Sequence, residues 1–469
     1  MLAAIHPLDL GILIIFLAIT LIVGLSHGRQ VKTIQDYALG GKNFSTATLV
    51  ATIIATWYGG GSFFNTLEQT YSTGLYFTIA LTGISIGLLL QGWLVLRMKM
   101  FINNVSVAEA VGSIYGKIPQ VITAVGGALA TLGYVSIQFK VISRILVTLF
   151  DFESSFATIV AAGITILYSA SGGIKAVTFT DVFQFFTFGT ILPVLALVIW
   201  HHRENSGHLV DALASNPLLD LKQIVDWRNP QFLSSLGLLL YFIIPGFSPD
   251  LFQRMAMARN VEQGKNAFVY AALISLLISL LFSWIGFLLL ADNPGLEASQ
   301  VVVHMVNKYT YPGLKGLVGI GVTALAMSTA DSCLNTASAM FANDIVRPLR
   351  GQKLSSTKVA RSFTILGGAF ALLLSLYSND LLSLMLLSSS FYKPVVAVPV
   401  LMAVLGFRTS TRVVLLSMAS GALTVVLWRS LSIGANSVVP GMLVNLFVLL
   451  VVHYLLGEPG GWKKVTLVK

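Results

Sequence analysis

Residues 312–346 form a largely apolar stretch, long enough to cross a bilayer, that carries a group of four polar residues near its middle. They are Ser328, Thr329, Asp331 and Ser332. Counted from Leu325, three of them follow at i+3, i+4 and i+7, which places them on one face of a helix. A carboxylate inside a bilayer is costly unless a cation or a proton compensates its charge. The pattern therefore predicts that something charged binds on this helix face.

Composition places the whole chain in a membrane. Of its 469 residues, 55% are hydrophobic and only 10% are charged, whereas a globular domain carries about 25% charged residues. We therefore expect an all-α protein that crosses the bilayer many times. The single cysteine, Cys333, excludes an intrachain disulfide.

Apolar segments of about 20 residues, the length that spans a bilayer, predict about thirteen transmembrane helices. They lie near 8–26, 46–71, 73–96, 119–149, 155–171, 176–200, 231–253, 266–290, 313–343, 362–378, 380–405, 412–431 and 438–456. With the N-terminus outside, about 20 Lys and Arg residues, Arg254 among them, fall in inner segments and about 6 in outer ones. We therefore expect the N-terminus outside and the C-terminus inside. The net charge of +10 is then a topology signal, and no nucleic-acid partner is expected.

Two of these spans contain helix-breaking sequences. Residues 55–62 read ATWYGGGS, and each glycine in a helix costs about 1 kcal/mol relative to alanine. Residues 245–249 read PGFSP, where Pro249 removes a backbone donor and clashes with the preceding turn. One interpretation is that these residues only kink their helices. However, each break opens a unit of five spans, and the two units enter the membrane from opposite sides, which is typical of inverted repeats with a binding site near the midplane.

This pairing predicts a 5+5 inverted repeat. We expect an extra N-terminal helix and a cytoplasmic loop at 1–45, and the first repeat at 46–200. An extracellular loop at 201–230 then leads to the second repeat at 231–405. Two C-terminal helices and a cytoplasmic tail follow at 406–469.

Four motifs resemble those of the sodium:solute symporter family, which includes carriers of proline, pantothenate, galactose and choline. They are YALGGKNF at 37–44, SGGIKAVTFTDVFQ at 171–184, GFSPDLFQR at 246–254 and MSTADSCLNTASAMFANDI at 327–345. The similarity extends from about residue 30 to residue 410. It implies the leucine-transporter fold, with one extra span before the ten-helix core and two after it. It also implies alternating access driven by a sodium ion.

The resemblance implies a sodium site between the first core helix, where it is broken, and the eighth core helix. By position, the family's carbonyl ligands correspond to Ala55, Tyr58 and Leu325, and its hydroxyl ligands to Ser328 and Thr329. The alternative is that the two hydroxyls only bond the carbonyls four residues earlier in their own helix. The aligned helix break favours the sodium site.

A second cation site is implied at Asp181, Asp331 and Ser332. Several relatives carry an aspartate at the position of Asp181, and Asp331 stands where others carry a hydroxyl. A carboxylate there strengthens a cation site or invites a proton. The alternative is an ion pair of Asp331 with Lys140 or Arg144, because buried charges are usually paired.

The predicted solute contacts are Trp57 and Ser62 at the first break and Phe247 and Ser248 at the second. Trp57 followed by three glycines resembles the choline carriers, whose ammonium is held through cation–π contacts. Those carriers have a tryptophan at the second break where this chain has Ser248, so the aromatic box is incomplete here. The alternative is that Trp57 and Phe247 are ordinary core aromatics.

Other functional classes fit less well. No enzymatic activity is expected, because none of the seven histidines falls in the middle of a span. A channel would favour pore-lining rings of like charge, whereas paired helix breaks favour a carrier. We therefore predict a sodium-coupled symporter of the cell membrane. Its partners would be a small polar organic solute and the lipid bilayer, with no obligatory protein partner. A proton-coupled or choline-type carrier and a channel are the alternatives.

Overall fold

The computed structural model describes residues 6–26, 31–150, 153–201, 206–350, 356–377, 391–431 and 437–463. These residues are mostly helical, as the sequence predicts. The first elements are α1 (Pro7–Ser26), α2 (Ile34–Leu39), η2 (Gly40–Lys42), α3 (Thr46–Trp57), α4 (Gly60–Thr73), α5 (Leu75–Val95), α6 (Val107–Tyr115), α7 (Lys117–Phe150) and α8 (Ser154–His201).

The second half of the chain begins with short helices and ends with a helix pair. Its first elements are α9 (Ser206–Ser215), η3 (Pro217–Leu219), α10 (Leu221–Ile224), α11 (Pro230–Ile243), α12 (Pro249–Ala256), α13 (Val261–Asp292), η4 (Ala298–Gln300), α14 (Val301–Tyr309) and α15 (Leu314–Met340). The last are η5 (Phe341–Val346), α16 (Arg347–Arg350), α17 (Ser356–Tyr377), η7 (Lys393–Ala397), α19 (Val398–Leu405), β1 (Phe407–Arg408), α20 (Thr411–Ser430), α21 (Val438–Leu455) and β2 (Gly461–Trp462). The two strands pair antiparallel.

Among the described residues, nine helices are long and apolar enough to cross a membrane, and the bent pair α3 and α4 would make a tenth. Two shorter apolar helices, Pro230–Ile243 and Lys393–Leu405, fall in the predicted spans 231–253 and 380–405. Residues 380–390 of the latter span lie outside the described residues. The predicted number of about thirteen spans, the repeat boundaries and the sidedness of the termini stay predictions.

One predicted loop is replaced by a kink. The spans expected at 155–171 and 176–200 are both part of α8, which is broken at Gly173 with φ 56° and ψ −154°. Glycine adopts this left-handed conformation without the steric penalty of a Cβ. An added Cβ at Gly173 would also come within 2.9 Å of Tyr37. The two helical segments therefore meet directly, with the backbone of α2 packed against the kink.

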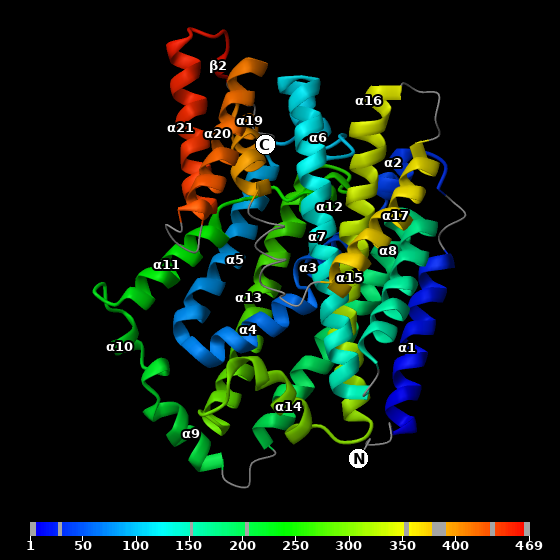
Figure 1. Cartoon of the computed structure of the whole chain (residues 1–469), viewed down its shortest axis with the longest axis vertical. Helices are drawn as coiled ribbons and strands as arrows, with labels where there is room; N and C mark the ends of the chain where they lie inside the picture. The colour runs from blue at the N-terminus through cyan, green and yellow to red at the C-terminus, as the bar shows by residue number, and fades with distance from the viewer. Residues whose placement is uncertain are drawn as a thin grey trace.

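The connecting segments gather at the two ends of the long axis of the molecule (Figure 1). Helices α2, α6 and α16 lie toward the upper end of the view, and α9, α10 and α14 lie toward the lower end. The sequence assigns the first three to inner segments and the other three to outer segments. Each set therefore shares one end of the molecule, as a polytopic topology requires.

Helix α15 is the most deeply buried of the long helices. In its most apolar stretch 94% of the residues are buried, and the helix packs against α7, α8 and α3. Small residues allow this close approach, since an added Cβ on Gly319 would come within 3.0 Å of Leu149. The polar face predicted on α15 is therefore sealed inside the helix bundle, next to the end of α3.

Candidate functional site

The first predicted break is present between α3 and α4. Helix α3 ends at Trp57, Tyr58 and Gly59 have extended backbone, and α4 begins at Gly60 after a bend of 60°. Close packing requires glycine here, because an added Cβ on Gly60 would come within 2.6 Å of Val141. The break leaves the last carbonyl groups of α3 without the partners that a continuous helix would give them.

The second predicted break is also present, at residues 244–248 between α11 and α12. Phe247 has a φ of 42°, a left-handed conformation that a bulky residue rarely adopts. The hydroxyl of Tyr392 donates to the carbonyl oxygen of Phe247 at 2.9 Å. Backbone strain of this kind costs about 1–3 kcal/mol and persists only where the surroundings enforce it. Tyr392 is one of the groups that hold this break.

Replacing Tyr392 with phenylalanine should loosen the second break. The change removes one buried hydrogen bond, which contributes about 1 kcal/mol, and keeps the ring. We expect a lower thermal midpoint of the purified protein, measured by intrinsic fluorescence. The matched control is Tyr377→Phe, because Tyr377 is 85% exposed. Equal midpoints for the two variants would show that the Tyr392 hydroxyl does not support the break.

Four of the five predicted sodium ligands meet between the end of α3 and the middle of α15. The Oγ atom of Ser328 lies 2.8 Å from the carbonyl oxygen of Ala55 and 3.0 Å from that of Leu325. The Oγ1 atom of Thr329 lies 3.4 Å from the Ala55 oxygen and 3.3 Å from the Leu325 oxygen. All four residues are buried. Neutral carbonyl and hydroxyl oxygens suit a monovalent cation that must bind and leave again.

The fifth predicted ligand, Tyr58, is anchored through its side chain. Its hydroxyl donates to the carbonyl oxygen of Ser275 at 2.8 Å and lies 2.7 Å from Ser279 Oγ, both on α13. The role of the Tyr58 carbonyl therefore stays a prediction. Sequence reasoning missed Thr56, whose carbonyl oxygen lies 3.2 Å from Thr329 Oγ1. Its position directly after Ala55, at the end of a broken helix, was the available signal.

Asp181 and Asp331 are linked by hydrogen bonds, because each carboxylate accepts from the hydroxyl of a residue adjacent in sequence to the other aspartate. Thr180 donates to Asp331 Oδ2 at 3.2 Å, and Ser332 donates to Asp181 Oδ2 at 3.4 Å. Both aspartates are fully buried. Among the described residues, the Oδ1 atom of each carboxylate has no hydrogen-bond partner. The structure thus brings the three predicted residues of the second site together, with two acceptor atoms still available.

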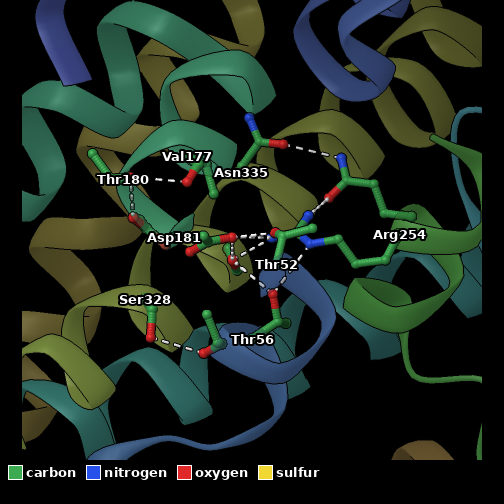
Figure 2. Close-up of polar contacts among 12 residues, drawn as sticks. Thr52, Thr56, Val177, Thr180, Asp181, Arg254, Ser328 and Asn335 are labelled. Carbon is green, nitrogen blue, oxygen red and sulfur yellow. Dashed lines mark hydrogen bonds and ion pairs between the residues drawn. The ribbon is translucent and has the colours of Figure 1, made fainter. Parts of the chain in front are cut away.

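A buried arginine, Arg254 of α12, completes this cluster (Figure 2). Its Nη2 atom lies 3.4 Å from Asp181 Oδ2, and its Nε atom donates to Thr56 Oγ1 at 3.1 Å. The guanidinium also donates to Ser332 Oγ. The sequence places Arg254 in an inner segment directly after a predicted span, and the structure adds that its side chain is fully buried. Helix α12 begins only at Pro249, so Arg254 lies in its second turn, where α12 packs against α3 and α15.

The ion pair considered for Asp331 is wrong. Arg144 Nη1 lies 3.3 Å from Glu68 Oε1, and Lys140 is in none of the ion pairs formed within the described part of the chain. Asp331 Oδ2 instead accepts a hydrogen bond from the hydroxyl of Tyr168 at 2.7 Å. The buried guanidinium near the two carboxylates comes from the second helix break rather than from α7.

A small cavity lies beside both breaks. Among the residues that line it are Trp57, Gln91, Phe247, Ser248 and Lys393. Three of the four predicted solute contacts therefore share one cavity. Ser62, half-buried on α4, is not among its lining residues, so its contact with solute stays a prediction. The cavity volume is about 20 Å³, room for roughly one water molecule. An organic solute therefore requires the surrounding helices to move apart.

Known transporters resemble this chain in sequence and in fold. The sodium:solute symporter family matches residues 37–421. The human high affinity choline transporter 1 is 25% identical over 432 residues, which are 86% of this chain and 73% of that transporter. A sodium/glucose cotransporter of Vibrio parahaemolyticus is 24% identical over 382 residues, which are 72% of this chain and 69% of that protein.

A solved structure confirms the expected leucine-transporter-type fold. It is the substrate-bound outward-open state of a Na⁺-coupled sialic acid symporter, with a TM-score of 0.85 and 17% identity, covering 99% of this chain and 100% of that chain. At this identity the likeness concerns the fold alone. The family match extends over most of the sequence and includes both helix breaks and α15. The chain therefore belongs to the sodium:solute symporter family.

Proposed function

We propose that the protein moves a small polar organic solute across the cell membrane together with sodium, by alternating access. The observation that supports this most directly is the set of buried neutral oxygens between the broken end of α3 and α15. Their residues, Ala55, Leu325, Ser328 and Thr329, fit a sodium ion in donor type. Family membership supports sodium coupling and transport rather than enzymatic catalysis.

The ion site and the solute cavity share the last turn of α3. Ala55 contributes a carbonyl oxygen to the ion site, and Trp57, two residues later, lines the cavity. A cation held between α3 and α15 fixes the end of α3 and with it the position of Trp57. Binding of solute against Trp57 stabilises the same turn. Because such coupling is reciprocal, each ligand should raise the affinity for the other.

Reconstituted vesicles test this function. A thermal-shift screen of small metabolites, with and without sodium, identifies solutes whose binding depends on sodium. Vesicles with an inward sodium gradient should then take up such a solute saturably, and potassium in place of sodium should abolish uptake. Uptake that is indifferent to sodium would disprove symport, and unitary conductance in a planar bilayer would indicate a channel.

We propose further that Asp181 and Asp331 hold a second cation, either sodium or a proton. Both carboxylates are buried, and among the described residues the Arg254 guanidinium pairs with Asp181 while no cationic side chain pairs with Asp331. Two buried carboxylates beside one guanidinium leave a negative charge uncompensated, and a buried charge of this kind requires a partner. The available Oδ1 atoms of the two aspartates supply acceptors for that cation.

The variant Asp331→Asn should remove the second cation without unfolding the site. The asparagine carbonyl oxygen can still accept from Tyr168, which now bonds the carboxylate. For the wild type we expect a Hill coefficient for sodium above one, or uptake that falls as lower pH protonates the carboxylates. Asp331→Asn should abolish that feature and keep simple sodium dependence. The measurement is the sodium and pH dependence of initial uptake rates.

A control separates this role from general stability. Asp9 is also buried, but it accepts two backbone hydrogen bonds at the start of α15, from Gly313 and Gly316. Asp9→Asn should therefore lower stability and leave the sodium and pH profiles unchanged. A wild type with a Hill coefficient of one and no pH dependence would rule out the second cation.

A further inference from the structure

Lys393 places a positive charge in the cavity between the two helix breaks. It is the first residue of η7 and lines the cavity together with Trp57, Phe247 and Ser248. A lysine in the middle of a membrane span is costly and by default marks a functional site with a partner. Sequence reasoning did not consider this residue, although a lysine inside the predicted span 380–405 was a visible signal.

Contacts on two sides fix the position of Lys393. Its aliphatic stem lies against the second break, since an added Cβ on Gly246 would come within 3.0 Å of Lys393 Cε. Its Nζ atom lies 3.7 Å from the ring centroid of Tyr241, a cation–π contact. The backbone of η7 is anchored in turn, because Asn445 Nδ2 donates to the carbonyl oxygen of Pro394 at 2.7 Å. The ammonium is therefore held beside the second break.

The charge of Lys393 is not balanced by an ion pair within the described part of the chain. The ion pairs found there join Arg144 to Glu68, Arg254 to Asp181, Lys265 to Glu262, and His304 and Lys308 to Asp292. The second break itself carries an acidic residue, Asp250, in the first turn of α12. Asp250 is not among the residues that line the cavity. A role of Lys393 in solute binding therefore has to be tested against neutralisation of Asp250.

The groups beside the cavity differ in what they offer to a negative ligand. The Oγ atom of Ser248 lies near Asp250 but makes no hydrogen bond of ordinary geometry. Helix α12 begins at Pro249, so the positive end of its dipole lies next to Ser248. Gln91 brings an amide to the same cavity. The Lys393 ammonium and the Gln91 amide are therefore the donors that this cavity offers to an anion, whereas Ser248 and the start of α12 already face the carboxylate of Asp250.

We propose that Lys393 binds a carboxylate group of the transported solute, so that the carrier selects small organic anions. The proposal rests on the symport function proposed above. The Lys393 ammonium would pair with the carboxylate, and Trp57 and Phe247 would cover the apolar part of the solute. The same charge repels an organic cation, and such repulsion is a common source of specificity. The carrier should therefore discriminate against choline, in contrast to the named activity of its human relative.

A panel of matched probes tests the selectivity of the wild type. The probes are lactate and lactamide, nicotinate and nicotinamide, pantothenate and pantothenol, and choline. Each is tested in saturating sodium by thermal shift and by uptake into vesicles. We expect one or more of the acids to bind and to be carried, and its amide or alcohol counterpart and choline to fail. Sodium-dependent uptake of a neutral or cationic probe, or a panel in which no acid binds, overturns the proposal.

Variants of Lys393 assign the selectivity to this residue. Lys393→Met keeps the stem against Gly246 and removes the charge, so affinity for the acid should fall roughly 10- to 100-fold, the usual range for a charged hydrogen bond. Lys393→Arg should retain most of the affinity. Lys117→Met, at an exposed lysine, is the matched control. Sodium alone should stabilise all three variants as much as it stabilises the wild type. If sodium does not stabilise even the wild type, then the proposed symport function fails, and the result does not bear on Lys393.

The rival role of Asp250 gives a different result. If Lys393 serves only to neutralise Asp250, Lys393→Met should lower the folded yield, and adding Asp250→Asn should restore both yield and affinity for the acid. If Lys393 binds the solute, the double variant should recover yield at most and remain weak in acid binding. Full recovery of acid affinity in the double variant overturns the proposal.

Discussion

Replacing Ser328 with alanine is expected to raise the sodium concentration for half-maximal uptake by roughly 10-fold or more, because a hydrogen-bonding or ligating group that meets a charge contributes about 1.5–3 kcal/mol. Ser328 Oγ lies 2.8 Å from the Ala55 carbonyl oxygen and 3.0 Å from that of Leu325, so it is central to the proposed site. The maximal rate at saturating sodium should change less than the half-maximal concentration. Initial uptake rates measured across a sodium titration provide both values.

Two further variants make this test specific. Ser338→Ala removes a buried hydroxyl from the same helix, where it bonds Leu334 and Thr364 away from the α3 break. It should affect stability without shifting the sodium dependence. Thr329→Ser keeps the second hydroxyl and should behave nearly as the wild type, whereas Thr329→Val should resemble Ser328→Ala. An unchanged sodium titration in both Ser328→Ala and Thr329→Val would exclude this ion site.

The helix breaks and the ion-site residues could be predicted because their signals are local or follow from family resemblance. Three glycines after Trp57, and two prolines around Phe247, disfavour a continuous helix in any surroundings. Both breaks are present at the predicted places. The helical spacing of Leu325, Ser328 and Thr329 predicted a shared face, and that face meets Ala55.

The charged partners could not be predicted in the same way. Arg254 follows a predicted span and was counted with the inner segments, and only the packing of α12 against α3 and α15 shows that it is buried. Arg144 and Glu68 are 76 residues apart in sequence, so no local pattern indicates their ion pair. A count of charges near the ends of spans thus predicts overall topology. It does not distinguish an arginine in a loop from an arginine that is buried because it lies on a helix that follows a break.

The variant Arg254→Met is expected to lower the folded yield strongly, because breaking a buried pair leaves an uncompensated charge at a cost of about 3–5 kcal/mol. The charge left behind is that of Asp181, which is fully buried and also accepts from Thr52 and Ser332. Adding Asp181→Asn should restore much of the yield, since the neutral pair leaves no unpaired charge. The measurements are the monodisperse fraction after solubilisation and the thermal midpoint of each variant.

Arg259→Met is the matched control for this experiment, since Arg259 is exposed just beyond the end of α12. It should fold as well as the wild type. High sodium should also raise the thermal midpoint of Arg254→Met more than that of Arg259→Met, because a cation near Asp181 takes over part of the lost guanidinium charge. If Arg254→Met folds normally and gains nothing from Asp181→Asn, then the buried pair does not stabilise the site. The negative charge of Asp181 and Asp331, which we propose the second cation compensates, would then have to be compensated by another group.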